Sequence, residues 1–390
     1  MSPRNKAILG TSQTLRAARR FNRRAVLGQV AAGTVAALGP WVLTSAAKAA
    51  GKELKIMVWS GYIPRGLKDS FESRTGVTLK VTSYVSNTDL LNKLTETKGR
   101  GFDIVGPSLN RSRLWRRLGV LKPWDMNRVP TDAIVPVMLE ASRARWTWDD
   151  GVHHLPYLWG SEALAWRTDK WSRSHEDLSY GDLWQPELKG VVMGRPYSLM
   201  VGIGLYLDRI GKLPTNRLLD SYKDEKTMRR IWTEITAVAV ERKPWIKLFW
   251  NNAKSQKNGF MQDGVILGQT WQGPALSLKS EGKPVTYTAP REGALAWLDG
   301  LSIPIGARNI DAIYAFLEVL YTPEIGGLLA SETGYNATAL GAEQYLSEQS
   351  RTNFMEAYPG DALDRLWWWP PEPVWYAAAR AEFRDRFVAA

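Results

Sequence analysis

The sequence predicts an α/β fold built in two domains, and three observations support that prediction. Residues 53–105 alternate between strand and helix patterns in the order strand, helix, strand, helix, strand, which is typical of a parallel α/β layout. The chain has 390 residues, too many for one ordinary hydrophobic core. Its 44% apolar and 23% charged residues argue against a disordered or fibrous chain.

The first strand and helix of this pattern are well marked. Residues 53–59 (ELKIMVW) predict a strand. Residues 64–74 then place Leu67 and Phe71 on one helical face, with Gly76 as the end of the helix.

The second half of the pattern completes a parallel sheet. Residues 77–85 are β-branched and alternating, and they predict a second strand. Asn87 is expected to cap the next helix, and residues 102–105 predict a third strand. Ligand groups gather beyond the carboxyl ends of parallel strands. The side chains at those ends are Trp59, Ser60, Tyr62, Ser108 and Asn110.

The rest of the chain continues with short elements. Extended segments are expected at 155–159, 163–166, 191–193, 264–270 and 301–304, a polar turn at 183–190, and helices at 225–240, 309–321 and 323–332. His153 and His154 precede an expected hinge strand and are predicted to be solvated loop residues.

The N-terminal region has the pattern of an export signal. Residues 1–24 are polar and basic, residues 25–47 carry no charge, and Ala47-Lys48-Ala49 fits a cleavage site. Arg23-Arg24 before an Ala/Gly-rich segment resembles a twin-arginine signal. We therefore expect residues 1–49 to be a twin-arginine-type signal that leaves no membrane anchor after cleavage, although 23 uncharged residues are also long enough to span a bilayer.

The basic character of the chain lies mostly in that leader. The whole chain has 51 Lys and Arg against 39 Asp and Glu, a net charge of +12. Residues 1–50 hold 8 of the basic residues and no acidic residue, so the remainder has a net charge of +4. This removes most of the argument for a nucleic-acid partner.

The cysteine and histidine content also limits the kinds of active site and metal site that the chain can form. With no cysteine and three histidines, the chain has no thiol chemistry and little material for a zinc site or a Ser-His-Asp triad. No cofactor and no metal are expected.

A set of ordered motifs resembles the polyamine-binding proteins of ABC transporters, the spermidine/putrescine type. The matching stretches are VWSGYIPRGLKDSFESRTGVTLKVTSYVSNTDLLNKL, FDIVGPS, LPYLWG, LWQPELKG, GVILGQTWQG, REGALAWLDGLSIP and ETGYNAT, which run in the family's order from about residue 53 to 340. The resemblance implies a two-lobed periplasmic binding protein fold (type II-like). Each lobe has a mixed, mainly parallel sheet flanked by helices, and the chain crosses the hinge more than once. The expected lobes are 50–157 with 300–335, and 158–299 with 336–390.

The resemblance also implies a set of ligand-binding residues. They are Trp59 and Tyr62 after the first strand, Ser108 after the third, Trp271 in GQTWQG, Trp297 and Asp299 in LAWLDG, and Tyr335 in ETGY. Ser60 and Asn110 neighbour them. These residue types suit an organic ammonium, because aromatic faces attract cations and a buried carboxylate fixes the amine through a charge-assisted hydrogen bond.

The sequence departs from the family where a second amine would be gripped. The family usually has two acidic residues after the strand that follows the LWQPELKG turn, but this chain has Arg195 and Tyr197 there and no acid in 191–202. Gly61 likewise stands at an often acidic position. Arg195, Tyr197 and Trp369 are further candidates for ligand contact, and Arg195 would suit an anion.

The predicted function is therefore a non-enzymatic, monomeric periplasmic receptor that closes on a small amine-containing, polyamine-like solute and delivers it to an ABC transporter permease. A zwitterionic or other non-polyamine solute is the alternative within that role. An exported carbohydrate-active enzyme is the alternative class, because tryptophans and carboxylates also line sugar clefts; that chemistry needs two carboxylates flanking one bond. The sequence offers no evident second one.

Overall fold

The computed structural model describes residues 53–390, and these divide into two units. Unit 1 takes the described residues up to Trp159 and Leu298–Leu346, and unit 2 takes Gly160–Trp297 and Ser347–Ala390. The chain thus passes between the units three times. The expected export signal lies outside the described residues.

The unit boundaries differ by a few residues from those expected from the sequence. The largest difference is at 336–346, which the sequence assigned to the second lobe and which belongs to unit 1. The physical reason is strand pairing, because Asn336 pairs with Trp159 and Ala337 with Leu158.

Unit 1 is a small parallel sheet with helices packed on it. Its elements are β1 Glu53–Trp59, α3 Arg65–Thr75, β2 Thr78–Tyr84, α4 Asn87–Glu96, β3 Ile104–Val105, η3 Leu109–Arg111, α5 Ser112–Leu118, β4 Leu121–Lys122, η4 Thr131–Ala133, α6 Pro136–Trp146, β5 Thr147–Trp148, β6 Gly151–Val152, β13 Ile303–Pro304, α11 Ile310–Leu320, α12 Pro323–Thr333, β14 Asn336–Ala337 and η9 Ala342–Tyr345. Two strands, β7 Leu155–Arg167 and β12 Leu295–Leu301, run through the unit boundaries.

The predicted strand and helix order of unit 1 is confirmed in its first half. β1 lies between β2 and β3 and is parallel to both. Helix α3 ends at Gly76, whose φ of 70° is the left-handed conformation that glycine adopts freely. The cap of α4 is a correction: Ser86, not Asn87, accepts the hydrogen bond from the Asp89 amide.

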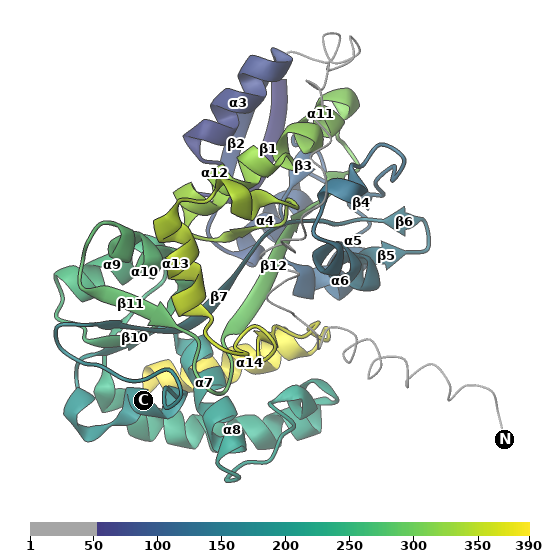
Figure 1. Ribbon diagram of the computed structural model, residues 1–390. Helices are drawn as coiled ribbons and strands as arrows, with labels where there is room; N and C mark the ends of the chain where they lie inside the picture. Colours follow the sequence, from purple (N-terminus) through teal and green to yellow (C-terminus); the bar gives the residue numbers. More distant parts are fainter. Residues whose placement is uncertain (1–52) are drawn as a thin grey trace. The chain divides into compact units, whose positions relative to one another are not determined.

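Helices α3, α11 and α12 cover the parallel sheet of unit 1 and form its core (Figure 1). Phe71 of α3 meets Phe316 of α11 edge to face, with 5.4 Å between ring centroids. Both rings are fully buried. Their contact holds α3 and α11 together on the sheet whose strand ends carry the candidate site.

Unit 2 is a mixed sheet with longer helices. Its own elements are η5 Tyr180–Trp184, η6 Pro186–Leu188, β8 Val192–Gly194, α7 Pro196–Arg209, η7 Leu219–Tyr222, α8 Glu225–Arg242, η8 Lys243–Trp245, β9 Ile246–Phe249, α9 Ala253–Met261, β10 Leu267–Trp271, α10 Gln272–Ser280, β11 Val285–Thr288, α13 Glu348–Ala357, β15 Trp367–Trp368 and α14 Tyr376–Ala389. β8 is parallel to β9 and β10, whereas β7 is antiparallel to β10 and β11.

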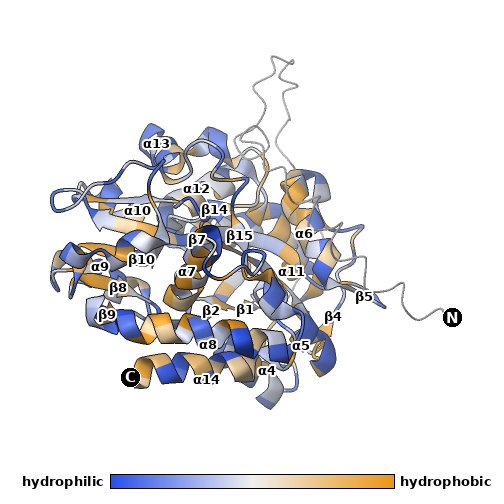
Figure 2. Cartoon of the chain, turned by 90° about the horizontal axis from the view of Figure 1, so that it is seen from below, coloured by the Kyte–Doolittle hydropathy of each residue, from blue (hydrophilic) through white to orange (hydrophobic). Residues whose placement is uncertain are grey.

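The core of unit 2 forms around α7, α8 and α14. Helix α7 is buried along most of its length, and it carries the hydrophobic colour in Figure 2, where α8 and α14 run beside one another. The segment 155–166 forms one strand, β7, rather than the two extended pieces expected, because Gly160 continues the extended backbone instead of breaking it.

The prediction for His153 and His154 is wrong. Both are almost fully buried, and the ring of His154 stacks on Trp146 at 4.9 Å. Ser142 Oγ and His154 Nδ1 lie 2.7 Å apart in a hydrogen bond. Burial lowers the pKa of His154 to about 3, so this imidazole is neutral at ordinary pH.

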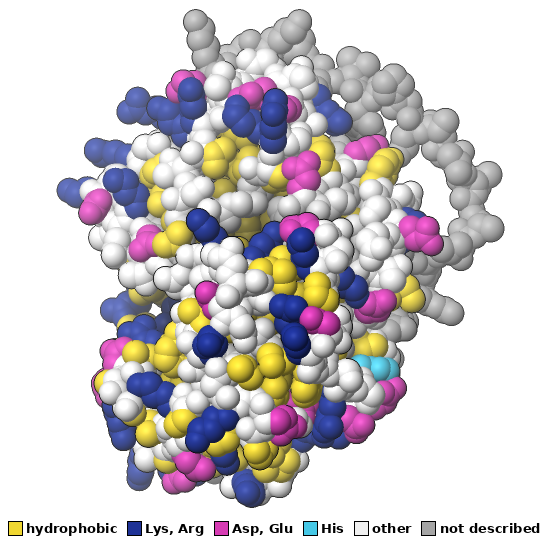
Figure 3. All heavy atoms as spheres, turned by 90° about the vertical axis from the view of Figure 1, so that its left-hand side faces the viewer, with side chains coloured by type: hydrophobic (Ala, Val, Ile, Leu, Met, Phe, Trp, Pro, Cys, Tyr) yellow, Lys and Arg dark blue, Asp and Glu magenta, His cyan; other side chains and the backbone are white. Residues whose placement is uncertain are grey.

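On the face drawn in Figure 3, Lys and Arg side chains lie interspersed with Asp and Glu.

Within residues 53–390, no single helix is long and apolar enough to cross a membrane. Helices α11 and α12 reach the length and apolar composition of a membrane span only when they are taken together, and this pair is bent by 79°.

Candidate functional site

The carboxylate of Asp299 is the centre of a polar cluster inside unit 1. Asp299 lies in the unit 1 part of β12 and is 3% exposed. Its Oδ2 accepts a 2.6 Å hydrogen bond from the Tyr62 hydroxyl, and its Oδ1 accepts one from the Ser108 hydroxyl. Two of the residues expected around an amine are therefore bonded directly to the expected carboxylate.

The parallel sheet explains why these residues meet. Tyr62 lies in the turn after β1, where its amide donates to the Trp59 carbonyl over 3.1 Å and Gly61 takes a φ of 84°. Ser108 follows β3 and forms an isolated bridge with Asp299. The ends of parallel strands share one edge of a sheet, so both hydroxyls reach the same carboxylate.

A side chain after β2 supports this arrangement. The Asn87 amide Nδ2 donates to the Ser108 hydroxyl over 3.0 Å, and its Oδ1 accepts from the Ser108 backbone amide over 3.3 Å. Asn87 was expected as a helix cap. It instead holds Ser108 so that the hydroxyl hydrogen points at Asp299.

Aromatic rings surround the cluster. Trp59 packs on Tyr84 with 4.7 Å between centroids. Tyr62 meets Tyr335 at 5.8 Å and Tyr157 at 5.9 Å, both edge to face. Three of the expected aromatics, Trp59, Tyr62 and Tyr335, therefore lie in one group around the carboxylate of unit 1.

The electrostatics of Asp299 are unusual for a buried acid. Burial raises its pKa to about 6, although the Ser108 and Tyr62 hydroxyls and the nearby Trp59 indole favour the charged form. Among residues 53–390, no lysine or arginine forms an ion pair with it. Such a group gains more from a bound cation than a carboxylate that already has an internal partner.

Two expected site residues of unit 1 lie beside this cluster without bonding to its carboxylate. Ser60 is exposed, and its backbone amide donates to the Tyr84 carbonyl over 3.0 Å. Asn110 is partly buried in η3, just after Ser108.

A second polar and aromatic cluster lies in unit 2. The Arg195 Nη2 donates to Glu162 Oε2 over 2.9 Å. The guanidinium carbon of Arg195 lies 5.4 Å from the ring centre of Trp250 and 5.5 Å from that of Trp271. The two indoles meet at 67° with 4.8 Å between centroids. Of the expected unit 2 residues, Arg195 and Trp271 are thus brought together.

Two other candidates of unit 2, Tyr197 and Trp369, pack in and against its hydrophobic core. Tyr197 is in the hydrophobic core, stacked between Trp232 at 5.2 Å and Trp369 at 5.4 Å. Trp297 is half-buried on the unit 2 part of β12. Tyr197 and Trp369 therefore contribute to packing within unit 2.

Glu162 and Trp250 were not among the residues expected at the site. Glu162 is fully buried in β7, and an acid within the otherwise apolar stretch LPYLWGSEALAW was the signal that could have found it. Trp250 is also buried, and nothing in its local sequence distinguishes it from the core tryptophans.

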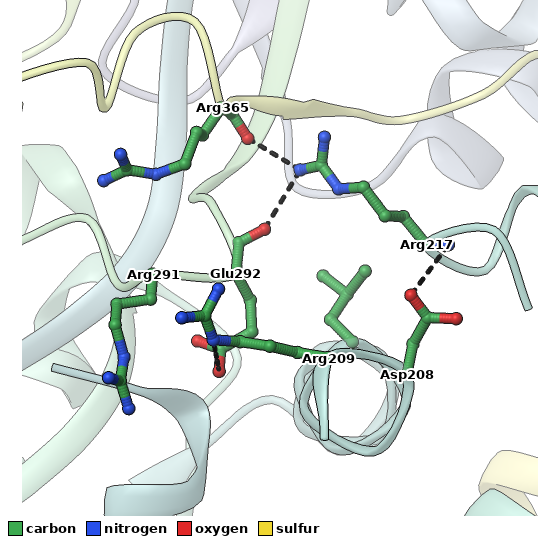
Figure 4. Close-up of a pocket in the computed structure, with 7 residues that line it drawn as sticks. Asp208, Arg209, Arg217, Arg291, Glu292 and Arg365 are labelled. Carbon is green, nitrogen blue, oxygen red and sulfur yellow. Dashed lines mark hydrogen bonds and ion pairs between the residues drawn. The ribbon is translucent and has the colours of Figure 1, made fainter. Parts of the chain in front are cut away.

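A pocket of about 290 Å³ in unit 2 has a different character (Figure 4). Its lining residues are Leu205, Asp208, Arg209, Arg217, Arg291, Glu292 and Arg365. Its two acids already serve the fold: Asp208 Oδ2 accepts from the Arg217 amide over 3.1 Å, and Glu292 Oε1 accepts from Ser179 over 2.6 Å. Four arginines against two acids would repel an ammonium, so this pocket does not fit the expected ligand.

No group of three or more His, Asp and Glu side chains in the part of the chain that the structure describes has the arrangement of a metal site. Both clusters offer contacts for an organic group instead.

Comparisons with known proteins identify the family of the chain and agree with its fold. Residues 66–353 match the family of bacterial extracellular solute-binding proteins. A spermidine/putrescine-binding periplasmic protein of Escherichia coli is 26% identical over 292 residues, covering 75% of this chain and 79% of that protein. Its Haemophilus influenzae counterpart, spermidine/putrescine-binding periplasmic protein 1, is 27% identical over 326 residues, covering 83% and 85%.

Solved structures show the same fold. A spermidine/putrescine ABC transporter substrate-binding protein of Streptococcus pneumoniae has a TM-score of 0.68 at 22% identity, covering 86% of this chain and 100% of that one. A putative spermidine/putrescine ABC transporter protein of Listeria monocytogenes has a TM-score of 0.67 at 22% identity, covering 87% and 99%.

Proposed function

Because the chain belongs to the family of bacterial extracellular solute-binding proteins, we propose that it is the receptor of an ABC transporter for a small solute with an ammonium group, and that Asp299 binds this group. The single observation that carries the proposal is a buried carboxylate that has hydroxyl donors and aromatic neighbours but no cation of the described chain as its partner. The family consists of binding proteins, and the chain is not an enzyme, so the carbohydrate-active alternative is set aside.

The physical case for an ammonium has two parts. Burial makes the negative charge of Asp299 costly, and an ammonium beside it offsets that cost through a charge-assisted hydrogen bond worth about 1.5–3 kcal/mol. Aromatic faces at Trp59 and Tyr62 add about 0.5–2 kcal/mol each where they meet the cation or its methylene groups. Together these contributions come to about 2.5–7 kcal/mol before the costs of ordering and desolvation, so micromolar affinity, near −8 kcal/mol, needs further contacts between the protein and the solute.

We propose that this chain differs from its relatives in the number of ammonium groups on its solute. The relatives named for spermidine and putrescine take solutes with two or more amines, which makes putrescine and spermidine natural test solutes here. The chain has no acid in 191–202, and its buried Glu162 is paired with Arg195. We favour a solute with one ammonium group, which includes zwitterions.

Calorimetric titration of the mature protein tests the proposal. The panel contains putrescine, spermidine, simple monoamines and amino-acid-like amines, and at least one is expected to bind with a micromolar dissociation constant. Asp299→Asn is expected to abolish that heat. Absence of binding across the whole panel, with a folded protein, would contradict the proposal.

The cellular setting follows from the same role. The curated relatives are periplasmic proteins, and the proposed location is the periplasm, reached through the twin-arginine route because of Arg23-Arg24. The proposed state is a monomer without a membrane anchor after signal cleavage, which delivers its solute to an ABC permease. Blocked export in a strain without the twin-arginine translocase would support that route, and unchanged export would exclude it.

A further inference from the structure

The side chain of Arg195 contacts a buried carboxylate and two indoles in unit 2. Arg195 directly follows β8 and precedes α7. Its guanidinium carbon lies within 5.5 Å of the ring centres of both Trp250 and Trp271, and its Nη2 donates to the carboxylate of Glu162 over 2.9 Å. Two indoles and a carboxylate are the groups with which proteins bind organic cations.

The hydrogen bonds around Arg195 fix its guanidinium in this place. Its Nε and Nη2 each donate to the Ser198 hydroxyl over 3.1 Å. Ser198 lies in the first turn of α7, so the helix that follows Arg195 also orients it. The arrangement is therefore built into the fold of unit 2 and is not a chance contact of a flexible side chain.

The exposure of Arg195 and Glu162 shows which of the two charged groups a solute can reach. The Glu162 side chain is 0% exposed and that of Arg195 is 37% exposed. The negative charge is thus covered, and the accessible group is the positive one. The Nη1 of Arg195 donates no hydrogen bond to any residue of 53–390, so this nitrogen presents free N–H donors.

We infer that Arg195 is an internal cation that occupies the cation-binding place formed by the Glu162 carboxylate and the Trp250 and Trp271 indoles in unit 2. Arg195 thereby makes this unit select against a second ammonium group on the solute and in favour of a carboxylate. The claim that Arg195 fills this place, the structural half, depends on unit 2 alone. The claim about the choice of solute, the selection half, rests on the proposed function.

Chemical rescue tests the structural half. Arg195→Ala leaves Glu162 buried without its partner, and the melting temperature is expected to fall by several degrees. Millimolar guanidinium chloride is expected to raise the melting temperature of this variant relative to equal sodium chloride, because free guanidinium refills the vacated place. In the wild type it should give no rise. Adding Glu162→Gln removes the anion, and the rescue should disappear.

Two outcomes would overturn the structural half. One is an Arg195→Ala protein that melts like the wild type. The other is a destabilised variant whose melting temperature does not respond to guanidinium, or responds equally when Glu162 is also changed.

A matched solute series tests the selection half. The compounds n-butylamine, 1,4-diaminobutane and 4-aminobutanoate share a four-carbon chain with one ammonium and differ in the far end, which is apolar, cationic or anionic. The wild type is expected to bind 4-aminobutanoate tightest and 1,4-diaminobutane weakest, with steps of roughly tenfold. Arg195→Ala should shift the ratio of 1,4-diaminobutane to 4-aminobutanoate affinity by at least about a hundredfold.

Control variants keep the test decisive. Arg380→Ala removes another unit 2 arginine that pairs with a buried acid, Glu372, over 2.6 Å and lies 4.7 Å from the ring centre of Tyr197; the solute order should not change. Should Arg195→Ala fail to fold, Arg195→Met with Glu162→Gln replaces the pair by neutral groups of similar size. That double variant should bind n-butylamine and 1,4-diaminobutane equally.

The outcomes separate the two claims. If the wild type binds none of the three compounds and no other amine, the proposed function fails. If it binds amines but the order is the same in the wild type and the Arg195 variants, only the inference about selection fails.

Discussion

The Tyr62 hydroxyl donates a 2.6 Å hydrogen bond to Oδ2 of Asp299, although 237 positions of sequence separate the two residues. One comes from the turn after the first strand of unit 1 and the other from the strand through which the chain returns to that unit. The bond orients a carboxylate whose pKa is raised by burial. The proposed ammonium site is built on this pair.

Replacement of Asp299 by asparagine should separate binding from stability. Because removing one partner of a buried charge pair costs about 3–5 kcal/mol, amine affinity should fall by roughly a hundredfold or more. The unliganded variant should be at least as stable as the wild type at neutral pH, since it no longer buries an unpaired charge. Calorimetry and thermal melts measure the two effects. Asp311→Asn is the control, because Asp311 is 58% exposed and paired with Arg128; equal losses in both variants would contradict the prediction.

Amine affinity should depend on pH through Asp299. Its pKa of about 6 in the free protein lies above the ordinary value of about 3.9. Below pH 6 a proton competes with the ammonium, so the association constant should fall about tenfold per pH unit and should level off above about pH 7. The same shift makes this residue lower the stability of the unliganded protein as the pH rises from about 4 to about 6. Titrations at a series of pH values check this, and an affinity that does not change between pH 7 and 5 would rule it out.

Tyr62→Phe should move the pH profile rather than abolish binding. The change removes one donor to the carboxylate, so the pKa of Asp299 should rise further and the midpoint of the binding profile should shift upward by about one unit. Tyr321→Phe is the matched control, since its hydroxyl donates to the Pro156 carbonyl in the same unit over 2.6 Å. The prediction is wrong if Tyr62→Phe weakens binding equally at every pH, or if Tyr321→Phe moves the midpoint as far.

His154 should contribute to acid sensitivity. Its pKa of about 3 in the folded protein is below the usual 6.5, so the unfolded chain takes up the proton first as the pH falls. The stability from this residue is present above about pH 6.5 and is lost progressively towards pH 3. Between pH 7 and 5 the loss of folding free energy is about 2 kcal/mol, because it begins only near pH 6.5 and then grows by about 1.36 kcal/mol per pH unit.

Urea unfolding of His154→Gln at pH 7 and 5 measures this loss. The variant should be less sensitive to that change of pH than the wild type. His175→Gln should behave like the wild type, because the His175 side chain is 42% exposed. Equal pH sensitivity of the wild type and His154→Gln would refute the assignment.

The first half of unit 1 was predictable because its signals are local. Alternation and helical period mark β1, α3 and β2 without reference to the rest of the chain, and Gly76 ends α3 by its backbone freedom. The cap of α4 was misassigned because Ser86 and Asn87 are both good capping residues and the choice depends on Ser108, which is 21 positions away.

The site could be predicted in part. The resemblance to a family selected Asp299, Tyr62 and Ser108, and these three are hydrogen-bonded in the structure. The pairing of Glu162 with Arg195 was missed, because an acid on a buried strand has no local feature that names its partner. The burial of His153 and His154 was also missed, because nothing in the loop before β7 shows that Trp146 and Trp148 stack on the two rings.

The ionisation of Asp299 with and without solute is the decisive measurement for the proposed contact between this carboxylate and an ammonium group. Carbon-13 labelling of aspartate allows its carboxyl resonance to be followed through a pH titration, and Asp299→Asn identifies the signal. The free protein should give a pKa near 6, and saturation with a bound amine should lower it by about two units or more. A pKa that is the same with and without the amine would show that the ammonium does not meet this carboxylate.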